Sequence, residues 1–199
     1  MRTLLLATSN LHKLGEFRAL FTDLPFRLFS LNDIQLDIDL EETGTTFAEN
    51  AELKALAYAQ ASGMFALADD SGLEIDALGG APGVQSARYL GRETSYEERF
   101  HRILELLQGL PVNQRTARFR CAIALAEPPR STRVVEGVIE GVIADSPRGK
   151  NGFGYDPIFY VPELGKTFAE LAPEDKNRIS HRARAARAAR EQLEEWPNQ

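Results

Sequence analysis

A chain of 199 residues, 43% hydrophobic and 26% charged, has the composition of a globular protein, and its length suits one domain over residues 1–199. The net charge of −6 argues against general nucleic-acid binding, and the apolar runs are too short to cross a membrane. The one cysteine, Cys121, lies in an apolar run, which indicates a packed core thiol and fits a reducing cytoplasm.

Strands and helices alternate in the first part of the chain. A short apolar run follows Met1, but Thr8-Ser9-Asn10 ends it, so we expect a buried strand rather than a signal peptide. Further along, Thr46 and Glu49 have the spacing of a helix capping box. The elements predicted here are a strand at 3–7, a helix from 10 to about 21, a strand at 26–31, a helix from 46 to about 60 and a strand at 65–68.

The second part of the chain is richer in strand signals. Residues 116–127 and 133–144 are long and β-rich, and the short polar segment 128–131 separates them, so they should pair as an antiparallel hairpin. Early alternation followed by a hairpin is typical of an α/β fold with a mixed sheet flanked by helices. The other elements predicted here are a glycine-rich loop at 79–83, a helix from 95 to 108, a glycine-dense loop at 149–157, a strand at 158–160 and a helix from 180 to 195.

Two adjacent carboxylates, Asp69 and Asp70, follow the strand at 65–68. Ser71-Gly72 comes next and is expected to turn the chain, which would present both acids at the rim of the sheet, where open α/β sheets bind ligands. Adjacent carboxylates repel each other, so a shared cation such as Mg²⁺ is the simplest way to keep both ionised. An ordinary strand-to-turn junction explains the same residues.

The segment from Thr8 to Lys13 lies where a strand meets the start of a helix. Free backbone N–H groups at a helix N-terminus bind phosphate, and the hydroxyls of Thr8 and Ser9 and the ammonium of Lys13 would add donors to those of Asn10. A plain N-cap beside a surface lysine accounts for the pattern equally well. The glycine patterns of P-loops and dinucleotide-binding folds are absent.

Further acidic and polar residues precede and open the helix at 46–60. Glu41 and Glu42 lie in a polar loop, and together with the paired aspartates they offer oxygen ligands for Mg²⁺. Asn50 and Lys54 stand four residues apart on the helix and could face the same ligand. A solvated loop and helix surface remain the simpler reading.

The loop at 149–157 contains the unusual run Gly152-Phe153-Gly154-Tyr155-Asp156. The glycines would let the backbone approach a flat ligand, and Phe153 could stack on a base. A tight turn whose aromatic rings fill the core is the alternative.

A basic stretch from Lys176 to Arg190 contains no acidic residue. Ser180 caps its helix and places the cationic side chains of His181 and Arg182 in the first turn, where the helix dipole disfavours positive charge. An anionic or carbonyl-rich ligand would explain that placement, and so would a solvated basic helix face.

The order of these motifs resembles the non-canonical purine NTP pyrophosphatases, the dITP/XTP pyrophosphatases of the RdgB/HAM1 type. The resemblance extends from Thr8 to Arg182, with one departure: Ser9 stands where the family usually has glycine, and would be strained if the position needs a positive φ. The matching motifs are Thr8-Ser9-Asn10-x-x-Lys13, Glu41-Glu42-Thr43-Gly44, Phe47-x-Glu49-Asn50-Ala51-x-x-Lys54-Ala55, Ala68-Asp69-Asp70-Ser71-Gly72-Leu73, Gly79-Gly80-Ala81-Pro82-Gly83, Ser86-Ala87-Arg88-Tyr89, Gly152-Phe153-Gly154-Tyr155-Asp156-Pro157 and Ser180-His181-Arg182.

The resemblance implies hydrolysis of ITP, dITP and XTP to the monophosphate and pyrophosphate, with Mg²⁺, by a homodimer. It implies an elongated mixed α/β fold with two lobes around a central nucleotide-binding cleft. Asp70 would be the catalytic proton acceptor, and Glu41 and Asp70 the metal ligands. The implied substrate-binding residues are Thr8, Ser9, Asn10, Lys13, Lys54, Ser71, Phe153, Gly154, Tyr155, Asp156, Lys176, His181 and Arg182.

Two other functions remain open. A Maf-like pyrophosphatase would act on other nucleotides, and a substrate panel would distinguish it. A non-catalytic nucleotide sensor would keep the pocket without hydrolysis, and the combination of Asp70 with Glu41 counts against it, because a sensor does not need a general base.

Overall fold

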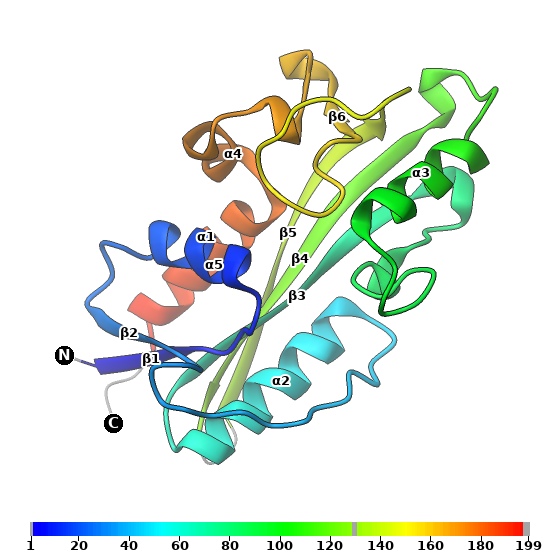
Figure 1. The fold of residues 1–199 in the computed structure, drawn as a ribbon. Coiled ribbons are helices and arrows are strands. Elements are labelled where there is room, and N and C mark those ends of the chain that lie inside the picture. The colour runs from blue at the N-terminus through cyan, green and yellow to red at the C-terminus, as the bar shows by residue number, and fades with distance from the viewer. Residues whose placement is uncertain (1, 129–130, 197–199) are drawn as a thin grey trace. The chain divides into compact units, whose positions relative to one another are not determined.

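Figure 1 shows the computed structural model, which describes residues 2–128 and 131–196. Within these residues, seven strands form one sheet in the order β2-β1-β3-β4-β5-β6-β7. The strands are β1 (Arg2–Leu6), β2 (Phe26–Ser30), β3 (Ala66–Ile75), β4 (Thr116–Glu127), β5 (Ser131–Ile143), β6 (Phe159–Val161) and β7 (Lys166–Thr167). The α-helices of the same residues are α1 (Leu11–Leu20), α2 (Phe47–Ser62), α3 (Tyr96–Leu106), α4 (Pro173–Ile179) and α5 (His181–Glu194).

The sheet is mixed, as predicted. β1 pairs in parallel with both β2 and β3, whereas β6 pairs antiparallel with β5 and β7. β4 and β5 are neighbours in the sheet, and the chain between Glu127 and Ser131 is too short for a parallel crossover, so they form the expected hairpin. Residues 129 and 130 of the predicted connection lie outside the described residues.

Helix capping explains why the predicted helices begin where they do. The side chain of Asn10 accepts hydrogen bonds from the backbone N–H groups of His12 and Lys13 at the start of α1. Thr46 and Glu49 form the predicted capping box of α2, and Gly63 ends that helix in the left-handed conformation. Two short elements were not predicted: α4, a seven-residue helix that Pro173 opens, and the two-residue strand β7.

The predicted turn at Ser71-Gly72 is wrong, because β3 continues through these residues to Ile75. Gly72 serves close packing within an extended strand: a Cβ there would lie 2.3 Å from Ser86 Oγ and 2.6 Å from the carbonyl oxygen of Gly83. The local turn preference of Ser-Gly is therefore overridden by tertiary contact.

The chain divides into two compact units. Unit 1 comprises Met1–Asp70, Cys121–Gly137 and His181–Gln199, and unit 2 comprises Ser71–Arg120 and Val138–Ser180. The prediction of one domain over residues 1–199 stays a prediction.

Unit 1 has its own hydrophobic core on one face of its strands. α1 and α5 lie side by side over this face (Figure 1). Phe17 of α1 and Leu193 of α5 pack there against Leu67 of β3 and Ile123 of β4. Cys121 is buried in the same core, which confirms the predicted packed thiol.

Unit 2 is built around aromatic side chains. The ring centroid of Phe119 lies 4.6 Å from that of Phe159 and 5.7 Å from that of Phe168, and Ile75 and Ile103 belong to the same cluster. Offset and edge-on ring pairs of this kind contribute about 0.5–1.5 kcal/mol each beyond burial. Among the residues that the structure describes, no helix has the length and apolar character to cross a membrane.

Two glycines of unit 1 test how closely its elements pack. A Cβ on Gly137 of β5 would lie 2.2 Å from the backbone oxygen of His181 and 2.3 Å from the backbone nitrogen of Ala185, so Gly137→Ala should lower the free energy of unfolding by about 1–3 kcal/mol. Gly15, inside α1, has nothing within 4 Å of its Cβ position, so Gly15→Ala should raise that free energy by about 0.5–1 kcal/mol. Urea unfolding of both variants measures the two effects, and equal stabilities would contradict the packing described.

Candidate active site

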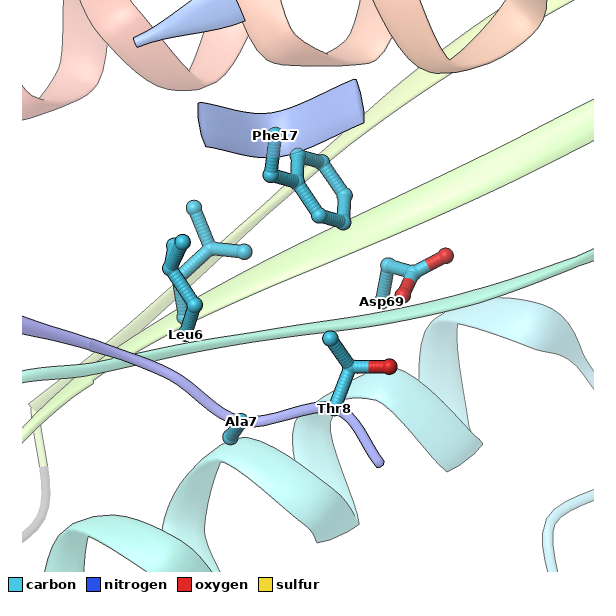
Figure 2. Close-up of a pocket in the computed structure, with 6 residues that line it drawn as sticks. Leu6, Ala7, Thr8, Phe17 and Asp69 are labelled. Carbon is cyan, nitrogen blue, oxygen red and sulfur yellow. The ribbon is translucent and has the colours of Figure 1, made fainter. Parts of the chain in front are cut away.

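The junction of β1 and α1 presents the predicted phosphate-binding residues. Thr8 Oγ1 accepts a hydrogen bond from the Asn10 N–H at 3.2 Å, and the Asn10 side chain caps the helix. Among the described non-glycine residues, positive φ angles occur at Gln35 and Leu90, so Ser9 carries no left-handed strain in place of the family glycine. A small pocket there is lined by Leu6, Ala7, Thr8, Phe17, Leu67 and Asp69 (Figure 2).

Asp69 lies on the face of β3 that α1 and α5 cover. Phe65 and Leu67 point into the unit 1 core, and Asp69 follows two residues later on the same face. Its Oδ2 atom lies 2.8 Å from the Lys13 ammonium and 3.7 Å from the Arg182 guanidinium. Burial by itself raises the pKa of this carboxyl, but the charges of Lys13, Arg182 and Lys54 outweigh burial and lower the pKa from 3.8 to about 2. Asp69 is therefore an ionised, buried counter-charge.

Asp70 points to the opposite face of β3, toward α2. Asn50 Nδ2 donates a hydrogen bond to Asp70 Oδ2 at 3.1 Å, and the Lys54 ammonium lies 3.8 Å from Asp70 Oδ1. Burial raises the pKa of the Asp70 carboxyl; Lys54 and Lys13 oppose the shift without cancelling it, and Glu42 adds to it. A carboxylate with a raised pKa is suited to accept a proton near neutral pH.

The two acids have different nearest cations, and the sequence-based expectation of a shared Mg²⁺ stays a prediction. The pleat of β3 separates them, so Asp69 meets Lys13 and Arg182 while Asp70 meets Lys54. Their environments shift the two pKa values in opposite directions, which is the pattern of a structural acid beside a reactive one.

The oxygen donors around Lys54 are of the type that Mg²⁺ prefers. The Lys54 ammonium lies 2.5 Å from Glu42 Oε1 as well as close to Asp70, so one positive charge already occupies the space between two carboxylates. Mg²⁺ usually takes one or two protein carboxylates and completes its shell with water and substrate phosphates. Glu41, the predicted ligand, is exposed, and within residues 2–128 and 131–196 no group of three or more His, Cys, Asp or Glu side chains could hold a metal alone.

In unit 2, the loop at 149–157 is held by a buried ion pair. Asp156 Oδ2 lies 2.6 Å from the Lys176 ammonium and accepts the Phe153 N–H at 2.9 Å. A Cβ on Gly152 (φ 75°) would lie 2.0 Å from the same oxygen, so only glycine fits there. The Lys176 ammonium also lies over the half-buried ring of Phe153, 5.0 Å from its centroid.

Several predicted residues are more buried than the sequence suggested. Tyr155 is 2% exposed and belongs to the unit 2 core, so its ring is a packing group, as the alternative reading held. His181 and Arg182 are buried as well, and Arg182 pairs with Glu16, so a solvated basic face does not describe the start of α5.

The predicted site residues fall into two groups. Those of unit 1 are Thr8, Ser9, Asn10, Lys13, Glu41, Lys54, Asp70, His181 and Arg182; those of unit 2 are Ser71, Phe153, Gly154, Tyr155, Asp156 and Lys176. Glu16, the partner of Arg182, was not predicted from the sequence. The available signal was its position three residues after Lys13, on the same face of α1.

Replacing each aspartate by asparagine should have different effects on the free energy of unfolding. Asp69→Asn leaves Lys13 and Arg182 buried without their carboxylate and should lower the free energy of unfolding at pH 7 by about 3–5 kcal/mol. Asp70→Asn removes a carboxylate whose ionised form is disfavoured by burial, so stability at pH 7 should stay equal or rise.

The pH dependence follows from the same shifts. The folded pKa of Asp69 lies below the unfolded value of 3.8, so its stabilisation is present above pH 3.8 and is lost as the pH falls toward 2. Denaturant unfolding measures this effect. As the pH falls from 7 to 3, the difference in free energy of unfolding between the wild type and Asp69→Asn should become smaller. If Asp69→Asn and Asp70→Asn lowered the free energy of unfolding equally at pH 7, the different environments described for Asp69 and Asp70 would be contradicted.

Comparison with known proteins identifies the family. The model of the Ham1 family matches residues 4–192. Proteins named dITP/XTP pyrophosphatase are 56% identical in Gloeobacter violaceus (94% of this chain, 92% of the relative) and 53% identical in Geobacillus kaustophilus (98% and 96%). The structure of a HAM1 protein from Coxiella burnetii is 47% identical, with a TM-score of 0.89, over 98% of this chain and 100% of that one. The protein therefore belongs to the Ham1 family.

Proposed function

We propose that this protein hydrolyses the non-canonical purine nucleoside triphosphates ITP, dITP and XTP to the monophosphate and pyrophosphate, and so cleanses the nucleotide pool. Relatives that share about half of its residues over nearly its whole length carry the name dITP/XTP pyrophosphatase. The observation that carries the proposal is the placement of the Asp70 carboxylate, which accepts a hydrogen bond from Asn50 at 3.1 Å and lies 3.8 Å from the Lys54 ammonium. Burial raises the pKa of this carboxyl, which supports a role as proton acceptor.

In the proposed reaction, Asp70 takes a proton from a water molecule as the water oxygen bonds to phosphorus. The bond between the α and β phosphates breaks, and pyrophosphate leaves with the electron pair. Asn50 fixes Asp70 Oδ2, which leaves Oδ1 facing Lys54. Asp70 with Glu41 or Glu42 would hold Mg²⁺, which supplies charge neutralisation at the phosphates when bound.

The cationic groups of unit 1 are assigned to the phosphates. The N-terminus of α1, with the Thr8 and Ser9 hydroxyls, offers backbone and side-chain donors, and Lys13 and Lys54 supply positive charge. Lys13 is already held by Asp69, so it is positioned before any ligand arrives.

Recognition of the base is assigned to Phe153, Asp156 and Lys176 of unit 2, whereas His181 and Arg182 of unit 1 keep their predicted role in substrate binding. Hydrogen-bond donors directed at a 6-keto oxygen would be left facing a 6-amino group in adenine, and unpaired buried donors discriminate strongly. Lys176, held by Asp156, is a donor of this kind.

The proposed assembly is a cytoplasmic homodimer that acts on free nucleotides, without nucleic acid or a membrane. The negative net charge supports the proposed absence of nucleic-acid binding, because polyanions bind basic surfaces.

Incubation with each triphosphate and Mg²⁺ tests the activity directly. ITP, dITP and XTP should each release one pyrophosphate per monophosphate, and ATP should react far more slowly. Asp70→Asn should reduce kcat at least about 100-fold, the usual effect of losing a general base, while equilibrium binding of ITP persists. Chelation of Mg²⁺ should abolish turnover reversibly. Binding without pyrophosphate release by the wild type would favour the sensor function instead.

Removing the aromatic ring of Phe153 tests the assignment of the base site. Phe153→Ala should raise KM for ITP by about 5- to 150-fold, which corresponds to the 1–3 kcal/mol of a base–aromatic stack. Phe153→Tyr keeps an aromatic face and should retain most of the affinity. An unchanged KM for Phe153→Ala would remove Phe153 from the site.

A further inference from the structure

Ser86 makes hydrogen bonds within its own turn and to two distant segments of unit 2, and the proposed reaction does not use it. Its side-chain oxygen accepts the Leu73 N–H at 2.9 Å and donates to the carbonyl oxygen of Gly83 at 2.6 Å. Its own carbonyl oxygen accepts the Tyr155 O–H at 2.9 Å. Ser86 is 4% exposed, so water competes little for these bonds.

Two of these partners lie near residues with a predicted or proposed role in substrate binding. Leu73 lies two residues after Ser71 on β3, which the family resemblance places among the substrate-binding residues, and Tyr155 lies two residues after Phe153 in the loop at 149–157. Gly72 permits the contact with β3, because any Cβ there would meet Ser86 Oγ at 2.3 Å. The approach of β3 to Ser86 is thus closer than any other residue at position 72 would permit.

Two other sets of contacts, besides the Tyr155 hydrogen bond to Ser86, hold the loop at 149–157. The backbone N–H groups of Lys150 and Asn151 both donate to the carbonyl oxygen of Ala169 at 3.0 Å, and Asp156 is held by Lys176. The Tyr155 hydroxyl is the tie between this loop and Ser86. Burial raises the pKa of that hydroxyl, so it remains a protonated donor at any physiological pH.

The Tyr155 ring is fixed independently of its hydroxyl. The ring packs edge-on against Tyr96 with centroids 5.3 Å apart and belongs to the unit 2 core. Removal of the hydroxyl alone should therefore leave the ring in place and release only the hydrogen bond to Ser86.

We propose that Ser86 is a positioning residue for nucleotide binding: its carbonyl oxygen, through Tyr155, holds the Phe153 ring at a fixed position, and its hydroxyl holds the β3 backbone beside Ser71. This inference rests on the proposed function for its substrate and on the hydrogen bonds above for its mechanism. Ser86 itself contacts no substrate in this account.

Tyr155→Phe tests the link to Phe153. KM for ITP should rise about 3- to 10-fold, the range that one hydrogen bond spans, with kcat within a factor of two of the wild type. A merely structural role would lower the amount of active enzyme, and so apparent kcat, at an unchanged KM. Tyr160→Phe makes the same chemical change on β6, and its KM should match the wild type.

Native-state hydrogen exchange supplies a readout that does not need turnover. The Phe153 N–H donates to Asp156, so its exchange should become about 3- to 10-fold faster in Tyr155→Phe, while amides of β4 keep their protection. Uniform acceleration across unit 2, or no acceleration at Phe153, would overturn the proposal.

Ser86→Ala tests the second link. It should raise KM for ITP and accelerate exchange of the Leu73 N–H, which loses its acceptor. An unchanged KM in both Ser86→Ala and Tyr155→Phe, with an active wild type, would reject the positioning role and leave the proposed function standing. An inactive wild type would reject the function, and the exchange rates at Phe153 would still decide the positioning role.

Discussion

The pleat of β3 places Asp69 and Asp70 on opposite faces of unit 1, and the electrostatics of the candidate site depend on that separation. Successive side chains of an extended strand alternate between faces, so the strand must run straight through both acids for them to part. Asp69 then enters the space below α1 and α5, where Lys13 and Arg182 meet it. Asp70 instead meets Asn50 and Lys54 of α2. One short run of backbone thereby carries one carboxyl whose pKa is lowered and one whose pKa is raised.

Burying these charges costs solvation free energy, which opposite charges packed beside them offset. Arg182 lies between Asp69 and Glu16, and Lys54 lies between Glu42 and Asp70, so each cation faces two carboxylates. Burial lowers the pKa of the Lys54 ammonium, but the carboxylates outweigh burial and raise it. Such preorganised charge needs no rearrangement when a polyphosphate binds, which is the usual electrostatic contribution to catalysis. The burial that raises the pKa of Asp70 also makes its ionised form unfavourable in the folded protein.

In unit 2, close approaches at glycines and buried hydrogen bonds hold loops that have little regular structure. Gly152 and Gly72 allow Asp156 and Ser86 to approach the backbone more closely than any side chain would permit. Buried polar contacts then hold the backbone at these places. Asp156 contacts Lys176 and the Phe153 N–H. Ser86 forms hydrogen bonds with Leu73, Gly83 and Tyr155. Fully satisfied buried networks of this type specify a single conformation.

By itself, the sequence determined the α/β class, the order of the main elements and the motifs of the site, because these depend on local signals. Asn10 and the pair Thr46–Glu49 start helices through neighbouring backbone groups, and apolar periodicity marks the strands. Only the tertiary structure decided that Ser71-Gly72 continues a strand, that Tyr155 is a core residue, and that Glu16 pairs with Arg182. Each of these depends on a partner far along the chain, such as Ser86 against Gly72, and local preference carries no information about such a partner. The same reason explains why two adjacent aspartates could be recognised as a motif in the sequence, while the opposite shifts of their pKa values required the folded chain around them.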